Sequence, residues 1–355
     1  MNFNGKVIDA HIHFTDMYDE NGKNMFDGLN EYQKKYGFKN INICCIPFSF
    51  SDISNNILAA IYKLKNPTAY AYGGPLYVDF PVVKPAPEGL DMLTQYNELM
   101  EIGFDGIKFY DSKPKEAKML KVFPDDDFNE AMFAQAEKDG THFIWHVGDP
   151  DTFWDAEKAP EWTHRLGYFY GDGTYPSNEA IYTAVLNVLK RHPKLNITFA
   201  HFFFWSEYPE RLVNLFETYP NVSIDLVPGS ELYGGILKNY DFYKDFFKKY
   251  SSRILYGTDV TFPRTDDYSD VLTSEVYNSV ATSNRIEIYN VEGKGLNLPE
   301  DVCRNILYNN FIRCNKSDTP RPINKAALKK YIEKYIGYAT KEKEKEFILE
   351  FAKTL

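Results

Sequence analysis

The chain of 355 residues has few cysteines and no long apolar run. No stretch of 18 apolar residues occurs, which excludes a conventional transmembrane helix. The first residues contain no basic region followed by an apolar segment, so no export signal is expected. The four cysteines, Cys44, Cys45, Cys303 and Cys314, form no CxxC pair, which argues against a disulfide framework and a cysteine-rich zinc site. The sequence therefore predicts a cytoplasmic protein without a membrane partner.

An excess of positive charge is also missing. Lys and Arg number 40 against 50 Asp and Glu, a formal net charge of −10. This balance argues against a nucleic-acid partner, because binding to a phosphate backbone requires a basic surface. Glycine-rich phosphate loops are absent too, since the first apolar run continues into FTDMYDENGKN with neither GxGxxG nor GxxxxGK[ST]. A doubly wound, nucleotide-binding sheet is therefore the less favoured of two α/β architectures.

What is present is an alternation of short apolar runs with amphipathic stretches. Several of the runs are almost continuously apolar, as in parallel strands that are buried on both faces. Strands are predicted at 6–14, 40–48, 68–77, 104–110, 141–147, 195–202, 221–227 and 253–260. Helices are predicted between them at 90–103, 126–140, 179–193 and 207–220, the first two ending at Gly and the last two at Pro. Eight strands, each followed by a helix or by a loop and a helix, predict a (β/α)8 TIM barrel.

Residues 148–177 form the longest segment without helical periodicity. The segment is too long for a simple connection, and loops of this length are commonly lids or binding loops. It follows the fifth predicted strand, so a barrel places it on the C-terminal face, where active sites are built. Its Trp154 and Arg165 are therefore candidate substrate-binding residues, and His164 is a further candidate contact.

The end of the chain differs from the barrel pattern. Residues 320–355 predict one or two extra C-terminal helices with basic faces, packed against the outside of the barrel. We expect a single domain over residues 1–355, in which the barrel occupies residues 6–315.

Four histidines and one aspartate lie at the ends of predicted strands. KVIDAHIHF places His11 and His13 on one face, because side chains two residues apart in a strand point to the same side. His146 ends the fifth strand, His201 ends the sixth and Asp259 ends the eighth. Since the carboxyl ends of barrel strands surround one mouth, these five side chains are expected to converge.

Imidazole nitrogen and carboxylate oxygen are the usual ligands of Zn²⁺, Mn²⁺ and Fe²⁺. Three or four protein ligands leave a position for water, whose pKa a bound ion lowers from about 15.7 towards about 7. An uncoordinated His or Asp beside that water can transfer protons. The pattern therefore predicts a catalytic divalent metal site, with zinc expected first and manganese or iron as alternatives.

Three other polar residues near these motifs are not expected to bind this ion. His142 begins the fifth strand, roughly 13 Å from His146 at about 3.3 Å per residue, so the two cannot bind one ion. His192 is expected near the C-terminus of a helix, where its charge is favourable. Asp9 is expected on the same strand face as His11, deeper in the barrel, as a supporting polar group.

The ordered set of motifs resembles the amidohydrolase superfamily, and more narrowly its amidohydrolase-related (amidohydrolase-2) branch of TIM-barrel hydrolases and decarboxylases. The resemblance covers residues 6 to about 315. It is carried by DAHIH, by the strand-end His146 and His201, by ILYGTD with Asp259, and by VCRNILYNNFIRC.

The resemblance implies roles for these residues. It implies that His11, His13, His146 and Asp259 bind the metal ion. His201, together with Asp259, would be the catalytic acid/base. The segment 302–314 looks like the one that closes such barrels.

Two interpretations are open for Lys108, in the motif GIKFY. Members with two ions carry a carbamylated lysine at this strand end as a bridge, and His201 would then become a ligand. Alternatively, Lys108 pairs with a carboxylate or binds a substrate anion, next to Tyr110 on the same face. One ion is favoured, because relatives in the narrower branch are usually mononuclear. Arg264 is a further substrate-binding candidate that could clamp a carboxylate, or pair with a neighbouring aspartate.

The function expected from these motifs is that of a metal-dependent hydrolase. It would use metal-activated water on a small organic amide, lactone or ester. The alternative is a metal-dependent lyase, a non-oxidative decarboxylase or hydratase acting on an unsaturated or aromatic carboxylic acid. The partner is expected to be a small-molecule substrate, and a homodimer is a candidate assembly because it is common among similar proteins.

Overall fold

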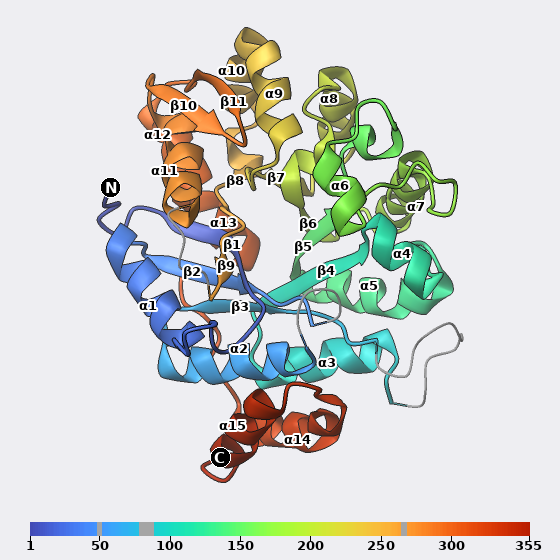
Figure 1. Cartoon of the computed structure of the whole chain (residues 1–355), viewed down its shortest axis with the longest axis vertical. Coiled ribbons are helices and arrows are strands. Elements are labelled where there is room, and N and C mark those ends of the chain that lie inside the picture. The colour runs from blue at the N-terminus through green and yellow to red at the C-terminus, as the bar shows by residue number, and fades with distance from the viewer. Residues whose placement is uncertain (48–51, 78–88, 264–267) are drawn as a thin grey trace.

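The computed structural model describes residues 1–47, 52–77, 89–263 and 268–355, and parallel strands form its centre (Figure 1). The strands are β1 (Ile8–Phe14), β2 (Asn40–Cys44), β3 (Tyr70–Gly73), β4 (Gly106–Ser112), β5 (His142–Val147), β6 (Asn196–Phe199), β7 (Val222–Asp225), β8 (Ile254–Leu255) and β9 (Thr261–Phe262). They pair in the order β8-β7-β6-β5-β4-β3-β2-β1-β9.

A single segment, residues 254–262, closes this sheet on itself. It begins as β8, which pairs with β7, and ends as β9, which pairs with β1. Between the two, Ala10 N donates to Tyr256 O at 3.1 Å. The predicted (β/α)8 TIM barrel is confirmed. The eighth predicted strand, however, is interrupted where Asp259 adopts a left-handed φ of 59°.

Helices surround the strands. They are α1 (Met25–Tyr36), α2 (Ser54–Lys65), α3 (Met92–Ile102), α4 (Pro114–Leu120), α5 (Asp127–Asp139), α6 (Glu161–Leu166), α7 (Asn178–Arg191), α8 (Pro209–Thr218), α9 (Ser230–Lys238), α10 (Tyr240–Lys249), α11 (Tyr268–Ala281), α12 (Glu300–Arg304), α13 (Asn310–Asn315), α14 (Lys325–Tyr335) and α15 (Glu342–Ala352). The predicted glycine stops are confirmed at Gly103 and Gly140, which cap α3 and α5 in left-handed conformations. Within the described ranges, no helix has the length and hydropathy that crossing a bilayer requires.

The elements for which no range was predicted include α1, α2, α10 and α11, helices of 10 to 14 residues, and several shorter elements. Segment 148–177 contains the 3-10 turn η1 (Asp151–Trp154) as well as α6, and a hairpin of β10 (Arg285–Ile288) and β11 (Val291–Lys294) follows α11. Elements of four to six residues carry too little periodicity to be separated from loop in a sequence.

The N-terminal end of the barrel is filled by packed side chains. Tyr72 OH lies 2.6 Å from His142 Nδ1, and His142 Nε2 lies 2.8 Å from Thr198 Oγ1. The ring of Phe311, in α13, stacks on the ring of Tyr72. Segment 302–314 therefore plugs this end of the barrel, and His142, at the start of β5, has both ring nitrogens bonded here, to Tyr72 and Thr198.

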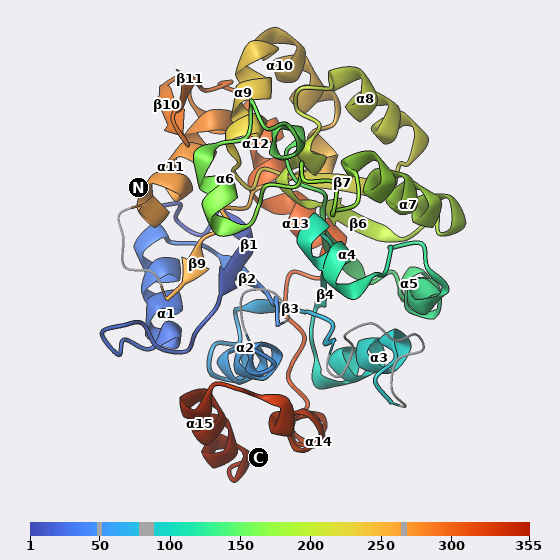
Figure 2. The ribbon, with the colours of Figure 1, turned by 45° about the vertical axis from the view of Figure 1, so that its right-hand side comes forward.

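The C-terminal helices α14 and α15 pack against α2 and α3 on the outside of the barrel (Figures 1 and 2). The buried Glu344 of α15 accepts hydrogen bonds from Met17 N and Ser54 Oγ. Asp52 accepts a further one from Thr340 N at 3.0 Å. The predicted extra helices are therefore present, and they are joined to the segments that follow β1 and β2.

The buried His142 gives the fold a pH dependence. Burial, with a contribution from Arg313, lowers the pKa of His142 to about 3. Between pH 6.5 and 3 the unfolded chain therefore binds the extra proton, so the free energy of unfolding falls as the pH falls. We expect His142→Gln to reduce this slope by up to about 1.4 kcal/mol per pH unit. Urea unfolding at several pH values measures it, and an unchanged slope would contradict the assignment.

Candidate metal centre

Three side chains meet at the C-terminal mouth of the barrel. His11 Nε2 lies 3.1 Å from His13 Nε2. Asp259 Oδ1 lies 3.1 Å from His13 Nε2 and 3.8 Å from His11 Nε2. Ligand atoms about 2.1 Å from one ion at tetrahedral angles are about 3.4 Å apart, so these spacings suit a shared cation. Among the described residues, this is the group of His, Cys, Asp and Glu side chains whose donor atoms lie close enough together for one ion.

The Nδ1 atom of each imidazole already has a hydrogen-bond partner. His13 Nδ1 lies 2.6 Å from Cys44 O, a carbonyl that only accepts, so this nitrogen carries the hydrogen. His11 Nδ1 lies 2.8 Å from Asp225 Oδ2, which favours the same tautomer. Both Nε2 atoms are thereby directed to the shared position, the arrangement that metal-binding histidines use. The donor set therefore fits a divalent cation.

A register irregularity in β1 brings the two histidines to the mouth. Pairing between β1 and β2 shifts between Asp9 and Ile12. Asp9 consequently points towards the helices, where it accepts hydrogen bonds from Tyr32 OH at 2.8 Å and Thr258 Oγ1 at 2.7 Å. The prediction that Asp9 shares a face with His11 was wrong, because an irregularity reverses the alternation of side chains along a strand.

Asp259 forms the more open side of the centre, with 29 % of its side chain exposed. Its backbone N donates to His11 O at 2.9 Å, which joins the end of the barrel sequence to the first strand. Burial opposes ionisation of Asp259, but the hydrogen bond with His13 and the neighbouring imidazoles lower its pKa well below the usual range. A negatively charged oxygen therefore faces the shared position at neutral pH.

His146 and His201 lie beside this group. The rings of His146 and His201 are 4.7 Å apart, and that of His201 is 6.3 Å from His11. His146 Nε2 lies 3.1 Å from Gly148 O and 3.3 Å from Lys113 Nζ. The strand ends thus bring all five predicted side chains to one mouth, with His146 turned towards β4.

His201 occupies an unusual backbone conformation. β6 ends at Phe199, two residues before it, so the strand predicted to residue 202 is too long. The four residues 201–204 have φ values of 53° to 59°, a left-handed turn that costs L-residues roughly 1–2 kcal/mol each. The turn stacks the His201 ring on Phe204 at 5.0 Å and the Phe203 ring on Phe199 at 4.1 Å. Burial, followed by the nearby His146, lowers the pKa of His201 well below 6.5.

Two buried lysines border the same centre. Lys108 Nζ lies 2.8 Å from His11 Nε2, and burial lowers its pKa. Lys113, which the sequence analysis missed, lies with Nζ 2.8 Å from Asp149 Oδ1. Burial opposes its charge, but Asp149 raises the pKa of Lys113 above its ordinary value. The Tyr110 ring lies within about 6 Å of both amines, as a wall between them.

The other predicted substrate contacts lie farther from this group or outside the described residues. Trp154 Nε1 donates to Pro176 O at 3.2 Å, within segment 148–177. Arg165 lies on the exposed surface of α6. Arg264 falls outside the residues that the structure describes.

Asp225 is the other residue of the centre that the sequence analysis missed. It ends β7 and is fully buried against His11. The rule applied to His146 and Asp259, that a polar residue at a strand end reaches the mouth, would have found it in NVSIDLV.

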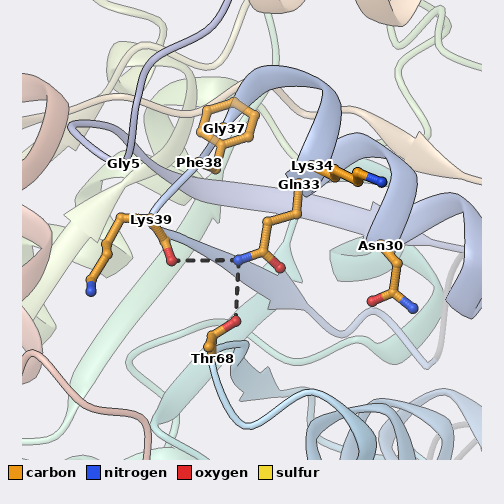
Figure 3. Close-up of a pocket in the computed structure, with 8 residues that line it drawn as sticks. All are labelled: Gly5, Asn30, Gln33, Lys34, Gly37, Phe38, Lys39 and Thr68. Atoms are coloured by element: carbon orange, nitrogen blue, oxygen red, sulfur yellow. Dashed lines mark hydrogen bonds between the residues drawn. The ribbon is translucent and has the colours of Figure 1, made fainter.

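A hollow on the surface is separate from this centre (Figure 3). It lies near the N-terminal ends of β2 and β3, where Gln33 Nε2 donates to Lys39 O and Thr68 Oγ1. Lys34 and Lys39 point away from one another in Figure 3, so they form no anion-binding pair. A narrower hollow does border the metal centre, and its lining includes Lys108 and Tyr110.

Solved structures of other proteins share this fold. A probable 2-pyrone-4,6-dicarboxylic acid hydrolase from Acinetobacter baumannii, with citric acid bound, has a TM-score of 0.52 at 12% identity, covering 88% of this chain and 99% of that chain. A 4-oxalomesaconate hydratase from Rhodopseudomonas palustris has a TM-score of 0.53 at 13% identity, covering 92% and 98%. A dihydroxybenzoic acid decarboxylase from a Polaromonas species, with bound manganese and the inhibitor 2-nitroresorcinol, has a TM-score of 0.52 at 13% identity, covering 89% and 97%.

Sequence comparison identifies the family. No curated protein matches the chain. A sequence model described as amidohydrolase matches residues 75–313, more than half of the chain. The match contains His146, His201 and Asp259, and the two histidines of β1 precede it. The resemblance found in the motifs is thus confirmed, and the chain belongs to the amidohydrolase family.

Proposed function

We propose that the chain is a cytoplasmic metal-dependent hydrolase that uses metal-activated water on a small organic amide, lactone or ester. The observation that supports this most directly is the convergence of His11 Nε2, His13 Nε2 and Asp259 Oδ1, with the far nitrogen of each imidazole already occupied. One divalent ion is proposed, zinc first and manganese or iron as alternatives, with His146 as the fourth ligand. The ion would act as a Lewis acid and lower the pKa of water at the site.

His201 is the proposed acid/base. Its lowered pKa keeps the imidazole neutral at pH 7, so it can accept a proton from water and return it to the leaving atom of the substrate. Stacking on Phe204 and the left-handed turn hold the ring in place. Asp259 has a second carboxylate oxygen that can share this proton, because its side chain is partly exposed at the mouth.

Lys108 and Tyr110 are proposed substrate-binding residues, and the structure adds Lys113. Two buried amines lie beside the imidazoles and are positioned to donate hydrogen bonds to a substrate anion. Trp154, Arg165 and Arg264 stay predictions for contacts at the mouth.

The second candidate is a lyase, a decarboxylase or hydratase of an unsaturated or aromatic carboxylic acid. The observation in its favour is the same pair of amines, Lys108 and Lys113, which would suit a carboxylate next to the ion. His201 would then protonate a substrate carbon. The names of the hydratase and the decarboxylase that share the fold lend support.

Metal content tests the proposed ligands. We expect about one divalent ion per chain by elemental analysis, and losses of 10- to 100-fold or more in affinity for His13→Ala and Asp259→Asn. His164→Ala is the matched control, because His164 is exposed on α6 and its ring stacks on Phe169, which follows this helix. Two ions per chain, together with a carbamate mass on Lys108, would support the binuclear alternative. Full metal content in both ligand variants would contradict the site.

A second variant tests the acid/base. We expect His201→Asn to keep the metal content and thermal unfolding temperature of the parent chain and to lose turnover by about 10²- to 10⁴-fold. Asn can adopt left-handed φ values, so the turn is retained. Unchanged turnover would remove His201 from the mechanism.

The two reaction classes are separated by a substrate screen. Lactones, amides and esters are assayed in ¹⁸O-water, and aromatic and unsaturated carboxylic acids are assayed for release of CO₂ or addition of water. Incorporation of ¹⁸O into a carboxylate product is the expected result. Turnover restricted to the carboxylic acids, and abolished in Lys113→Met, would replace the hydrolase by the lyase.

A further inference from the structure

Asp225 makes two kinds of contact with the candidate site. It lies at the C-terminal end of β7 and is fully buried. One carboxylate oxygen, Oδ2, is 2.8 Å from His11 Nδ1. The other, Oδ1, accepts hydrogen bonds from the backbone N of His201 at 2.9 Å and of Val227 at 3.2 Å. A single side chain therefore touches a proposed ligand and the proposed acid/base.

The contact with His11 determines which ring nitrogen is free. A neutral imidazole carries one hydrogen, and the carboxylate draws it to Nδ1. Nε2 then keeps its lone pair, towards which Lys108 Nζ and the shared cation position lie. Without an acceptor at Nδ1, the hydrogen can move to Nε2, and that form of the ring offers no lone pair at the shared cation position.

The contact with His201 stabilises a backbone conformation that is unfavourable in free energy. His201 starts the left-handed turn beyond the last residue pair of β6 and β7, and its N–H donates to the side chain of Asp225. A buried N–H without an acceptor costs about 1–3 kcal/mol. The charged carboxylate supplies a strong acceptor at this point, and the turn places the His201 ring beside His146.

We propose that Asp225 is a positioning residue that couples the two parts of the centre: it directs the His11 lone pair to the ion and holds His201 in the conformation needed for proton transfer. The proposal rests on the metal site proposed above. It predicts that a substitution of Asp225 alters the environment of His11 or of His201, although His11 lies in β1 and His201 follows β6.

Asp225→Asn tests this, because an amide cannot satisfy both contacts. If its oxygen faces His201 N, its NH₂ group faces His11 Nδ1 and pushes the ring hydrogen to Nε2. If its oxygen faces His11, its NH₂ group faces the His201 N–H, and the turn loses its acceptor. Either orientation removes one contact while preserving the size of the side chain.

The readout that needs no activity is ¹⁵N NMR of metal-free chain with labelled histidine. The unsubstituted chain is expected to show His11 with its hydrogen on Nδ1. Asp225→Asn is expected to move that hydrogen to Nε2 or to shift the signals of His201. Zinc affinity, measured by competition with a chelator, is expected to fall 10- to 100-fold, as for the loss of other carboxylate partners of ligand histidines.

Asp9→Asn is the matched control. Asp9 is equally buried and also accepts two backbone hydrogen bonds, from His11 N and Thr258 N, but its side chain contacts neither imidazole. It is expected to lower stability and to leave the His11 tautomer unchanged. A tautomer change in both variants would mean a general loss of structure and would overturn the proposal.

The remaining outcomes decide this inference independently of the proposed function. If the chain binds no divalent ion while His11 still carries its hydrogen on Nδ1 and responds to Asp225→Asn, the metal function fails and the positioning role stands. If the unsubstituted chain carries the hydrogen on Nε2, the proposal is overturned without any variant. Wild-type zinc affinity and unchanged histidine signals in Asp225→Asn would overturn it as well.

Discussion

The hydrogen bonds between β1 and the segment 254–262 are the interaction on which the rest of the structure depends. They close the barrel, and they also carry Asp259 to the histidines of β1. Asp259 N donates to His11 O, and His13 N donates to Val260 O at 2.8 Å. Closure of the fold and assembly of the candidate metal centre are therefore one event. A chain in which this segment is displaced would lose the third side chain of the candidate centre together with the last strand.

Two buried carboxylates stabilise the backbone where β1 meets segment 254–262. Asp9 lies on the helix side of β1 and binds Thr258, next to Asp259, while Asp225 lies on the mouth side and binds His11 and His201. Burial raises the pKa of Asp9 to about 7 and that of Asp225 to about 6, which shows how costly an unpartnered charge would be here. Their hydrogen bonds offset only part of this cost, because both pKa values stay raised, and they restrict the site to one arrangement.

Part of the backbone strain lies at the same place. Asp259 and residues 201–204 adopt left-handed φ values without glycine. Such conformations persist where the surroundings determine them, and they cluster at functional sites. Here the stacked rings of Phe199 and Phe203, and of His201 and Phe204, pack the turn on both sides. These aromatic contacts stabilise the turn that orients the histidine.

The sequence by itself determined the alternation of strands and helices, the strand ends that carry histidine, and hence the barrel and its family. Buried parallel strands and glycine-capped helices are local patterns, which a sequence records directly. Only the tertiary structure decided which way each side chain points. It turned Asp9 outward through the irregularity of β1, ended β6 before His201, and placed Lys113 at the mouth. These outcomes depend on register and on contacts between distant strands, and no local pattern encodes either of them.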